Sequence, residues 1–487
     1  MISIREALDA MMARFDALSA ERVPLDRALG RVLARPLVAR EDVPGFDNSA
    51  MDGYAVRARD LEGASAEVTV SLPLTGESRA GGEAPRALEA GSAARIFTGA
   101  PLPEGADAVV MQEDVERSGG AILFRAAAPP GKHVRRRAEV LAAGGPLLEA
   151  GARIGVGEIG LLASQGYAHV PVHRRPRVAL LSTGDELREI GEPPRAGSLI
   201  DSNAHALAAA VREAGGVPVM LPRAPDDRAE LARAVAEGIA SADVFVSCGG
   251  VSVGEYDLLH EVFAELGVAE VFWKVRIKPG KPLRFGVAGR VPVVGLPGNP
   301  VSALLTFEVF VRPALRRMAG DRAPHRRVID VELARSMRAP ERRTELARVR
   351  LERRAGAPPL AHPHRDQGSG ALTSLVGLDA LLPARRGQRR AHGRRAGARA
   401  RSLWGARERD PAALIGRRSA ARGASRHGQS PGSPSVSNGP VPTLDGAEAG
   451  GTLSSSGPAS KGTNRTSRAS TCRRSIRDET IPPRFPR

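Results

Sequence analysis

Cysteine is scarce in this chain of 487 residues, which contains only Cys248 and Cys472. Two cysteines exclude a disulfide scaffold and a zinc site built from several thiolates, and they are typical of a reducing cytosol. No apolar run reaches the roughly 20 residues of a membrane-spanning helix, and the N-terminus lacks the apolar core of a signal peptide. The sequence therefore predicts a soluble cytoplasmic protein with no membrane partner.

Lysine is the second scarce residue, with five lysines against 66 arginines. Three of the five, Lys274, Lys278 and Lys281, fall within eight residues. In so arginine-rich a chain, an ordinary solvated face is expected to carry arginine. A site for phosphate or another oxoanion, in contrast, needs a compact ammonium donor. We therefore predict a functional role for these three lysines.

The positive charge is concentrated at one end of the chain. The formal net charge is +17, but residues 385–487 contain 22 Lys and Arg against 6 Asp and Glu, a net charge of +16. Residues 1–384 are nearly neutral, at +1. High positive charge favours nucleic acid or an anionic membrane as partner. Here only the tail favours nucleic acid, and the body is predicted to bind small anions.

Residues 174–322 alternate short β-branched runs with helical periods, which is typical of parallel strands joined by crossover helices. Strands are predicted over residues 178–182, 217–221, 243–247, 271–277 and 291–296. Helices are predicted over residues 203–214, 228–239, 257–266 and 301–318. This pattern predicts a doubly wound α/β domain.

The remaining chain divides into three regions. Residues 1–173 are predicted to form an extended N-terminal module with a β subdomain inserted at about residues 55–135. Residues 323–384 alternate like strands and predict a small C-terminal β domain. Residues 385–487 hold only 11 large apolar residues. Because so few cannot offset the chain entropy by burial, we expect disorder there.

Four polar loops follow strand ends of the α/β domain, where ligands of open α/β sheets bind. They cover residues 182–187, 247–257, 273–282 and 296–302. Their glycines let backbone amides approach a phosphate, and their hydroxyls and carboxylates suit an anion or a hard cation. Helix initiation alone also explains Asn299 as a cap and Pro300 at the first helical position. Cys248 is predicted to be a small buried residue and not a nucleophile.

Seven motifs of the chain, in order, resemble the molybdopterin molybdenumtransferase family, which is related to the C-terminal domain of gephyrin. The motifs are DNSAMDGYA (47–55), FTGAPLPEGADAVV (97–110), STGDE (182–186), GGVSVG (249–254), KPGKP (278–282), LPGNPVS (296–302) and QGSG (367–370). Several are long and specific, and together they cover about residues 1–384. The resemblance implies that the α/β domain binds molybdopterin.

The resemblance also implies a reaction and its residues. The family inserts molybdate into adenylylated molybdopterin, in molybdenum cofactor biosynthesis, and releases AMP with Mg²⁺ as cofactor. The implied magnesium ligands are Glu186, Asp226 and Asp257, whose carboxylate oxygens also suit this ion chemically. With Asp52 and the three lysines they form the implied catalytic set. Contacts with the phosphates and the pterin are implied for Thr183, Gly249, Gly250, Ser252, Pro297, Gly298, Asn299 and Pro300, and Lys274, Arg348 and Ser369 are implied to bind molybdate or close the site.

Asp52 lies outside the α/β domain, in a loop that reaches the partner's active site in dimers of this family. The resemblance therefore implies a homodimer with a composite active site. It also implies molybdopterin adenylyltransferase as the pathway partner. The alternative for Asp52 is a tight turn that its carboxylate caps.

Two features depart from the family. Ala138-Glu139-Val140 stands where the family usually has Gly-Glu-Asp, so a carboxylate near the site is missing. The family-like sequence also stops at about residue 384, so the resemblance implies that the C-terminal β domain is incomplete. One hypothesis for residues 385–487 is a shifted reading frame in GC-rich DNA, and the rival is a disordered arm that binds nucleic acid or another polyanion.

Three functional classes stay open. The first is the molybdenumtransferase. The second is the related molybdopterin adenylyltransferase, whose enzyme shares the α/β domain but lacks the long first module. The third is a catalytically weakened scaffold that binds molybdopterin, which Val140 favours.

Overall fold

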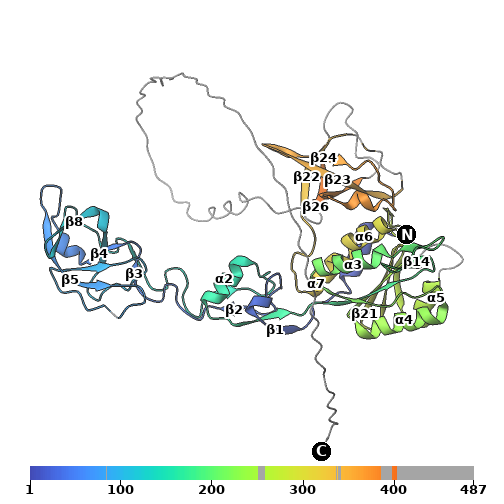
Figure 1. Ribbon diagram of the computed structural model, residues 1–487, viewed down its shortest axis with the longest axis horizontal. Helices are drawn as coiled ribbons and strands as arrows, with labels where there is room; N and C mark the ends of the chain where they lie inside the picture. Colours follow the sequence, from blue (N-terminus) through green and yellow to red (C-terminus); the bar gives the residue numbers. More distant parts are fainter. Residues whose placement is uncertain (84, 251–257, 336, 338–341, 385–396, 403–487) are drawn as a thin grey trace, which may run out of the picture. The chain divides into compact units, whose positions relative to one another are not determined.

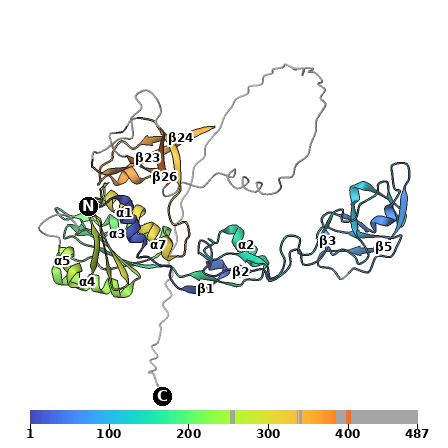
Figure 2. The same cartoon turned by 180° about the vertical axis from the view of Figure 1, so that it is seen from behind.

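The computed structural model describes residues 1–83, 85–250, 258–335, 337, 342–384 and 397–402, and Figures 1 and 2 show its elements from two sides. The predicted site residues Ser252 and Asp257 lie outside the described residues. Within the described part, no helix is both long and apolar enough to cross a membrane.

A six-stranded sheet forms the centre of the α/β domain, in the order β16-β13-β17-β21-β20-β18. The first four strands run parallel to one another. The predicted doubly wound α/β arrangement is confirmed. The strands are β13 (Arg177–Ser182), β16 (Val217–Met220), β17 (Val244–Cys248), β18 (Ala269–Trp273), β20 (Arg284–Ala288) and β21 (Val291–Leu296).

Helices cover both faces of this sheet because its strands are apolar on both sides. In β13, Val178 and Leu180 belong to the core beneath α3, α6 and α7, whereas Ala179 and Leu181 belong to the core beneath α4 and α5. Figure 1 shows α4 and α5 together on one side of the sheet. The helices are α3 (Ser202–Glu213), α4 (Arg228–Ser241), α5 (Leu258–Glu265), α6 (Pro300–Thr306) and α7 (Arg312–Met318).

The sequence pattern predicts a wholly parallel sheet, but this sheet is mixed. β20 and β18 run antiparallel to their neighbours at one edge. β20 and β21 are joined only by Gly289 and Arg290, and Gly289 has a φ of 59°. A two-residue connection can close an antiparallel hairpin but cannot form a parallel crossover, which needs about a dozen residues.

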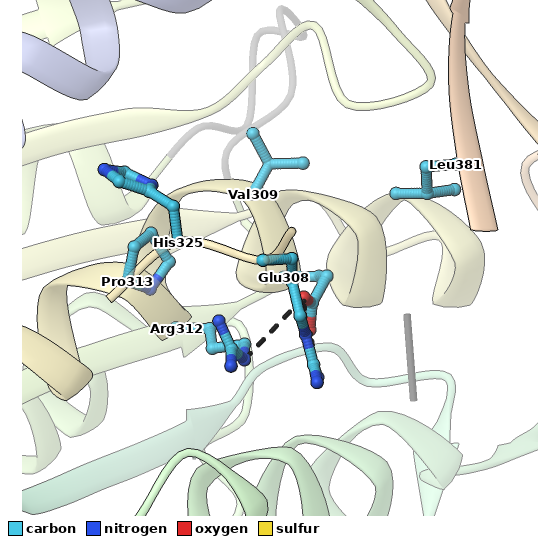
Figure 3. Close-up of a pocket in the computed structure, with 7 residues that line it drawn as sticks. Glu308, Val309, Arg312, Pro313, His325 and Leu381 are labelled. Atoms are coloured by element: carbon cyan, nitrogen blue, oxygen red, sulfur yellow. Dashed lines mark hydrogen bonds and ion pairs between the residues drawn. The ribbon is translucent and has the colours of Figure 1, made fainter. Parts of the chain in front are cut away.

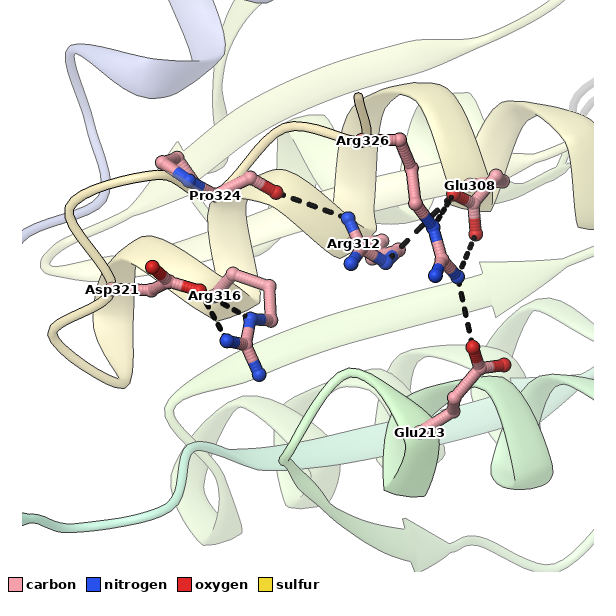
Figure 4. A network of polar contacts seen from close by, with 7 residues as sticks. All are labelled: Glu213, Glu308, Arg312, Arg316, Asp321, Pro324 and Arg326. Carbon is pink, nitrogen blue, oxygen red and sulfur yellow. Dashed lines mark hydrogen bonds and ion pairs between the residues drawn. The ribbon is translucent and has the colours of Figure 1, made fainter. Parts of the chain in front are cut away.

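The long helix predicted over residues 301–318 contains a π-helical segment at Phe307–Val311, between α6 and α7. This segment carries Glu308, which is 4 % exposed. Arg326 donates hydrogen bonds of 2.8 Å to both Glu308 and Glu213, so it ties the chain after α7 to α3 (Figure 4). Burial raises the pKa of Glu308 and lowers that of Arg312 to about 10.

The same glutamate lines a small pocket with residues from three segments (Figure 3). Pro313 belongs to α7, His325 to the chain that follows it, and Leu381 to the C-terminal sheet. Most of the pocket's charged groups pair with one another, so it serves packing at this junction.

The first helix, α1 (Ile4–Met12), begins at Ser3, which forms a capping box with Glu6. Its buried face and Phe15 join the core of the α/β domain, where Phe15 stacks on Phe285 at a ring-centre distance of 6.0 Å. The first residues of the N-terminal module therefore pack on the α/β sheet.

The rest of the N-terminal module consists of short antiparallel pairs that lead to the predicted β subdomain. The pairs are β1 (Ala20–Pro24) with β12 (His169–His173), β2 (Leu37–Val38) with β11 (Pro146–Leu148), and β3 (Asn48–Ser49) with β10 (Val134–Arg135). One helix, α2 (Val156–Ser164), packs beside them. The subdomain sheet has the order β7-β4-β6-β5-β9-β8, with strands β4 (Gly53–Val56), β5 (Val70–Ser78), β6 (Ala93–Ile96), β7 (Ala108–Met111), β8 (Val115–Ser118) and β9 (Ala121–Phe124).

The C-terminal sheet continues beyond residue 384, the expected end of this domain. β26 (Gly397–Ser402) pairs with β22 and β25. Its sequence alternates Ala with Arg and contains no large apolar residue, so it gives no strong strand signal. The other strands are β19 (Ile277–Lys278), β22 (Val328–Leu333), β23 (Thr344–Arg354), β24 (Ala357–Pro363) and β25 (Ala380–Ala384).

Candidate active site

The carboxyl ends of β13, β17 and β21 meet at one edge of the α/β sheet. The chain passes from β13 to β16 on one side and later to β17 on the other, so the strand order reverses between β13 and β17. Ligands of open α/β sheets bind in the crevice at such a reversal. Thr183 follows β13, and its backbone N–H donates to the carbonyl oxygen of Cys248 at 3.3 Å. The expected clustering of the first, second and fourth polar loops is thus present.

Gly249 and Gly250 are required by the close approach of two loops. Gly249 has a φ of 100°, and a Cβ atom there would lie 2.8 Å from the carbonyl oxygen of Thr183. Gly250 has a φ of 62°, and its Cβ would lie 2.8 Å from a methyl group of Leu259. A side chain at Gly249 would therefore push the two loops apart, and one at Gly250 would displace Leu259 of α5.

Thr183 contributes a buried hydroxyl to this crevice. The residue is 4 % exposed, and its Oγ1 has no hydrogen-bond partner among the described residues. A buried hydroxyl without a partner is unfavourable by about 1–3 kcal/mol, so a ligand that accepts its hydrogen bond would recover that energy. This geometry is compatible with the predicted ligand contact.

The loop of residues 297–300 is held from two sides. The side-chain amide of Asn203 donates to the carbonyl oxygen of Gly298 at 2.7 Å, and the Cys248 thiol lies 3.5 Å from the carbonyl oxygen of Pro297. Asn299 is the N-cap residue of α6 and Pro300 occupies its first turn, as predicted, but the Asn299 side chain makes no capping hydrogen bond. It is exposed, so capping does not explain this side chain.

Cys248 is 4 % exposed at the end of β17. Burial, together with the negative charge of Asp201, raises the pKa of its thiol to about 12. A thiol that stays protonated at neutral pH is a poor nucleophile. Cys248 therefore has the structural role that its sequence context predicts.

Three carboxylates gather beside the crevice. The backbone N–H of Asp226 donates to Asp185 Oδ1 at 3.2 Å. Partial burial of the carboxyl group, and then the negative charges of Asp185 and Glu186, raise the pKa of Asp226, although the residue remains exposed. Among the described residues, no three acidic, His or Cys side chains converge closely enough to hold a metal ion. The predicted set of Glu186, Asp226 and Asp257 is thus only partly visible, because Asp257 lies outside the described residues.

The three clustered lysines have different surroundings. Lys274 has a φ of 70°, and its ammonium group lies 3.4 Å from the centre of the Trp273 ring. Lys278 forms an ion pair of 3.0 Å with Glu345 of the C-terminal sheet. Lys281 is exposed, and its carbonyl oxygen accepts a hydrogen bond from the Val275 N–H. Two of the three ammonium groups are therefore held by neighbours.

The C-terminal domain contacts the α/β domain through Ser369 and buries Arg348 within its own sheet. The carbonyl oxygen of Ser369 accepts a hydrogen bond of 3.0 Å from the N–H of Val301, in the first turn of α6. Arg348 on β23 is fully buried, and its Nη2 donates to the carbonyl oxygen of Asp366 at 3.2 Å. Its Nε and Nη1 have no partner in the described part of the chain, and desolvation lowers the pKa of its guanidinium group.

Asp52 lies between β3 and β4 of the N-terminal module. Its carboxylate accepts hydrogen bonds from the backbone N–H and the hydroxyl of Thr98, at 2.7 and 2.8 Å. These bonds, the backbone bond first, lower the pKa of Asp52. They join the first two sequence motifs and match the alternative in which Asp52 caps a turn.

The segment Ala138-Glu139-Val140, which differs from the expected Gly-Glu-Asp, also has an unusual backbone conformation. Ala138 has a φ of 60°, a conformation that favours glycine, which is the residue that the resemblance implies there. Val140 is 77 % exposed, so an apolar side chain faces solvent where the resemblance implies a carboxylate.

Three residues that hold the site together are not predicted from the sequence. Asn203 reaches the 297–300 loop, Trp273 supports Lys274, and Glu345 pairs with Lys278. Only the position of Trp273 beside the lysine cluster could have indicated its role. The other two contacts join segments that are far apart in sequence.

Three family models match this chain. One described as "MoeA N-terminal region (domain I and II)" matches residues 2–166, one described as "Probable molybdopterin binding domain" matches residues 179–317, and one described as "MoeA C-terminal region (domain IV)" matches residues 330–397. Together they span the N-terminal module, the α/β domain and most of the C-terminal sheet.

Named relatives and solved structures agree with these matches. Molybdopterin molybdenumtransferase of a Nostoc species is 42% identical over 303 residues, which are 62% of this chain and 70% of the relative. Molybdopterin molybdenumtransferase 2 of Mycobacterium tuberculosis is 39% identical over 374 residues, or 74% and 92% of the two chains. The crystal structure of a molybdopterin biosynthesis protein from Pyrococcus horikoshii is 33% identical, with a TM-score of 0.71 over 82% of this chain and 99% of that chain. The chain thus belongs to the molybdopterin molybdenumtransferase family, and its role lies in molybdenum cofactor biosynthesis.

Proposed function

We propose that this protein is a transferase that inserts molybdate into adenylylated molybdopterin and releases AMP. The names of its relatives support the reaction class. The observation that carries the proposal is the meeting of the loops after β13 and β17, where the buried hydroxyl of Thr183 has no partner among the described residues and the backbone of Gly249 and Gly250 approaches closely. Such a crevice suits the phosphates of a nucleotide adduct.

Each group of site residues is assigned a role in this reaction. Thr183 and the two glycines hold the phosphates. Lys278 and Lys281 balance the negative charge that the released phosphate carries, while Lys274, Arg348 and Ser369 bind molybdate or close the site. Pro297, Gly298, Asn299 and Pro300 contact the pterin or the nucleotide, because their loop is fixed by Asn203 and leaves the Asn299 side chain exposed. Ser252 and Asp257 keep the roles that their motif implies.

The residues present fit Mg²⁺ as the cofactor. Glu186 and Asp226 would hold it, since Mg²⁺ commonly takes one or two carboxylates and completes its shell with water and substrate phosphates. The raised pKa of Asp226 supports this assignment, because a bound cation relieves the repulsion among the three carboxylates. When bound, Mg²⁺ would neutralise charge on the phosphoanhydride that is cleaved.

The active protein is proposed to be a homodimer in the cytoplasm, with Asp52 of one protomer completing the site of the other. This role of Asp52 rests on the family resemblance, since its carboxylate already accepts two hydrogen bonds from Thr98 of its own chain. Size-exclusion chromatography with mass detection tests the dimer, and a mass of one chain would contradict it. The pathway partner is the molybdopterin adenylyltransferase that supplies the adenylylated substrate.

Molybdate-dependent release of AMP from adenylylated molybdopterin tests the reaction. The proposal expects release that requires both molybdate and Mg²⁺. Formation of the adenylylated compound from ATP would instead indicate the adenylyltransferase. A second candidate, a scaffold that binds molybdopterin with weak turnover, is favoured by the exposed Val140. Tight binding without AMP release would support that candidate.

A further inference from the structure

The lysine-rich segment is shared by two domains. Its strand β19 (Ile277–Lys278) runs parallel to β23 of the C-terminal sheet, with Ile277 opposite Thr344 and Lys278 opposite Glu345. The backbone N–H of Thr344 also donates to the carbonyl oxygen of Arg276 at 3.0 Å. The C-terminal domain therefore fixes the backbone of this segment directly.

The ion pair between Lys278 and Glu345 is unequally buried. The Glu345 side chain is 8% exposed and the Lys278 side chain 45%, with 3.0 Å between the ammonium nitrogen and the nearer carboxylate oxygen. The carboxylate is thus fixed inside the C-terminal domain, while the ammonium group has an open side. An unpaired charge in a nearly buried position is strongly unfavourable, so Glu345 requires a cation beside it. Because Glu345 is the fixed partner, it restrains the more exposed Lys278.

Arg348, a second cation of the candidate site, lies three residues further along β23 and is fully buried. Desolvation lowers the pKa of its guanidinium group, and the negative charges of Asp366 and then Glu345 oppose this. Residues three apart on a strand face opposite sides of the sheet, so Glu345 pairs with Lys278 and not with Arg348.

We propose that Glu345 is a positioning residue, which holds the ammonium group of Lys278 so that its open side is presented to an oxoanion or phosphate. The inference rests on the proposed function for the identity of that anion. It assigns to the C-terminal domain a part in the site that goes beyond closing it. Lys278 can be followed chemically because the chain has only five lysines.

Selective acylation tests the contact without any substrate. The full chain is treated with a succinimidyl ester, and modification of Lys278 and of the exposed Lys281 is followed by peptide mass spectrometry. Glu345→Gln should raise the labelling rate of Lys278 relative to Lys281 by about tenfold, because the ammonium group loses its charged partner. Glu332→Gln, which removes another partly buried acidic partner in the same sheet, should leave the ratio unchanged. An unchanged ratio in Glu345→Gln would overturn the proposal.

A double-mutant cycle on AMP release then tests the role in the reaction. Glu345→Gln and Lys278→Ala should each lower kcat/KM, and the double variant should be no slower than Lys278→Ala alone, since the two side chains act as a unit. Glu345→Asp should recover part of the loss. Additive losses would overturn the positioning role. Absence of AMP release in the unmodified protein would instead refute the proposed function, and the labelling result would still stand.

Discussion

The side-chain amide of Asn203 donates a hydrogen bond of 2.7 Å to the carbonyl oxygen of Gly298, and so joins the start of α3 to the loop before α6. Asn203→Ala should weaken AMP binding about tenfold, because the 297–300 loop loses this link. Isothermal calorimetry with AMP measures the change. Ser202→Ala at the neighbouring position is the control, and equal losses in both variants would argue against a specific link.

Thr183 and Thr306 form a matched pair of buried threonines. Thr183 Oγ1 has no partner in the described part of the chain, whereas Thr306 Oγ1 donates to the carbonyl oxygen of Ser302 at 2.7 Å. Thr183→Val should therefore raise the free energy of unfolding by about 1 kcal/mol but weaken AMP binding by about 1–2 kcal/mol. Thr306→Val should lower the free energy of unfolding and leave AMP binding unchanged. Calorimetry with AMP and thermal unfolding measure both effects in both variants. Normal AMP binding by Thr183→Val would show that Thr183 does not contact the ligand.

Ala138 adopts a backbone conformation that favours glycine. Its φ of 60° is unfavourable for a side chain with Cβ by about 1 kcal/mol. Ala138→Gly should therefore raise the free energy of unfolding by about 0.5–1 kcal/mol, measured by urea denaturation. Ala143→Gly, in the same segment but without a positive φ, should lower it. A loss of stability in Ala138→Gly would show that the strain is relieved in another way.

Asp226 should couple stability to magnesium and pH. Its raised pKa means that the folded protein holds this proton more tightly than the unfolded chain, so its contribution to stability is lost as pH rises through the raised pKa. At pH 7, Mg²⁺ should restore stability and raise Tm, and this effect should fade as the pH falls and Asp226 takes up its proton. Asp226→Asn should remove most of the effect of Mg²⁺. Asp227→Ala, which removes the N-cap of α4, should lower Tm but keep the effect of Mg²⁺.

Arg174 and Asp243 join the end of the N-terminal module to the α/β sheet by two hydrogen bonds, of 2.7 and 2.6 Å. Burial alone would raise the pKa of Asp243, but the bonds from Arg174 and from the Arg177 N–H lower it below 3.8. A depressed pKa stabilises the fold above the unfolded value, and this contribution is lost as the pH falls through the folded pKa. Arg174→Ala should therefore lower the unfolding free energy at pH 7 by about 1–2 kcal/mol and have little effect near pH 2. Equal losses at both pH values would exclude the ion pair as the cause.

Hydrophobic periodicity predicted the α/β domain well because each strand and helix there buries an apolar face. Strand β13 is the clearest case, since its successive residues pack into the cores on opposite sides of the sheet. Strand β20, which lies between β21 and β18, was missed because a two-residue turn separates it from β21. β26 was missed because Ala and Arg alternate in it without any large apolar side chain.

The candidate site was predictable where a loop carries its own chemistry. Gly249 and Gly250 follow a strand directly, and the three lysines stand out against 66 arginines. Partners from distant segments were not predictable, because pairing across domains leaves no local pattern. Glu345 is an ordinary acidic residue in sequence, and only the pairing of β19 with β23 brings it to Lys278.

The pairing of β3 with β10 means that the β subdomain could be deleted without opening the rest of the N-terminal module. Val134 lies opposite Ser49 and Arg135 opposite Asn48, so the chain leaves and returns at points that are about 5 Å apart. Residues 50–133 could then be replaced by a two-residue turn at almost no expense in loop-closure entropy. The activity of such a shortened protein would show what the α/β domain does without the inserted sheet. Other β subdomains could also be inserted at the β3–β10 pair and compared in the same protein.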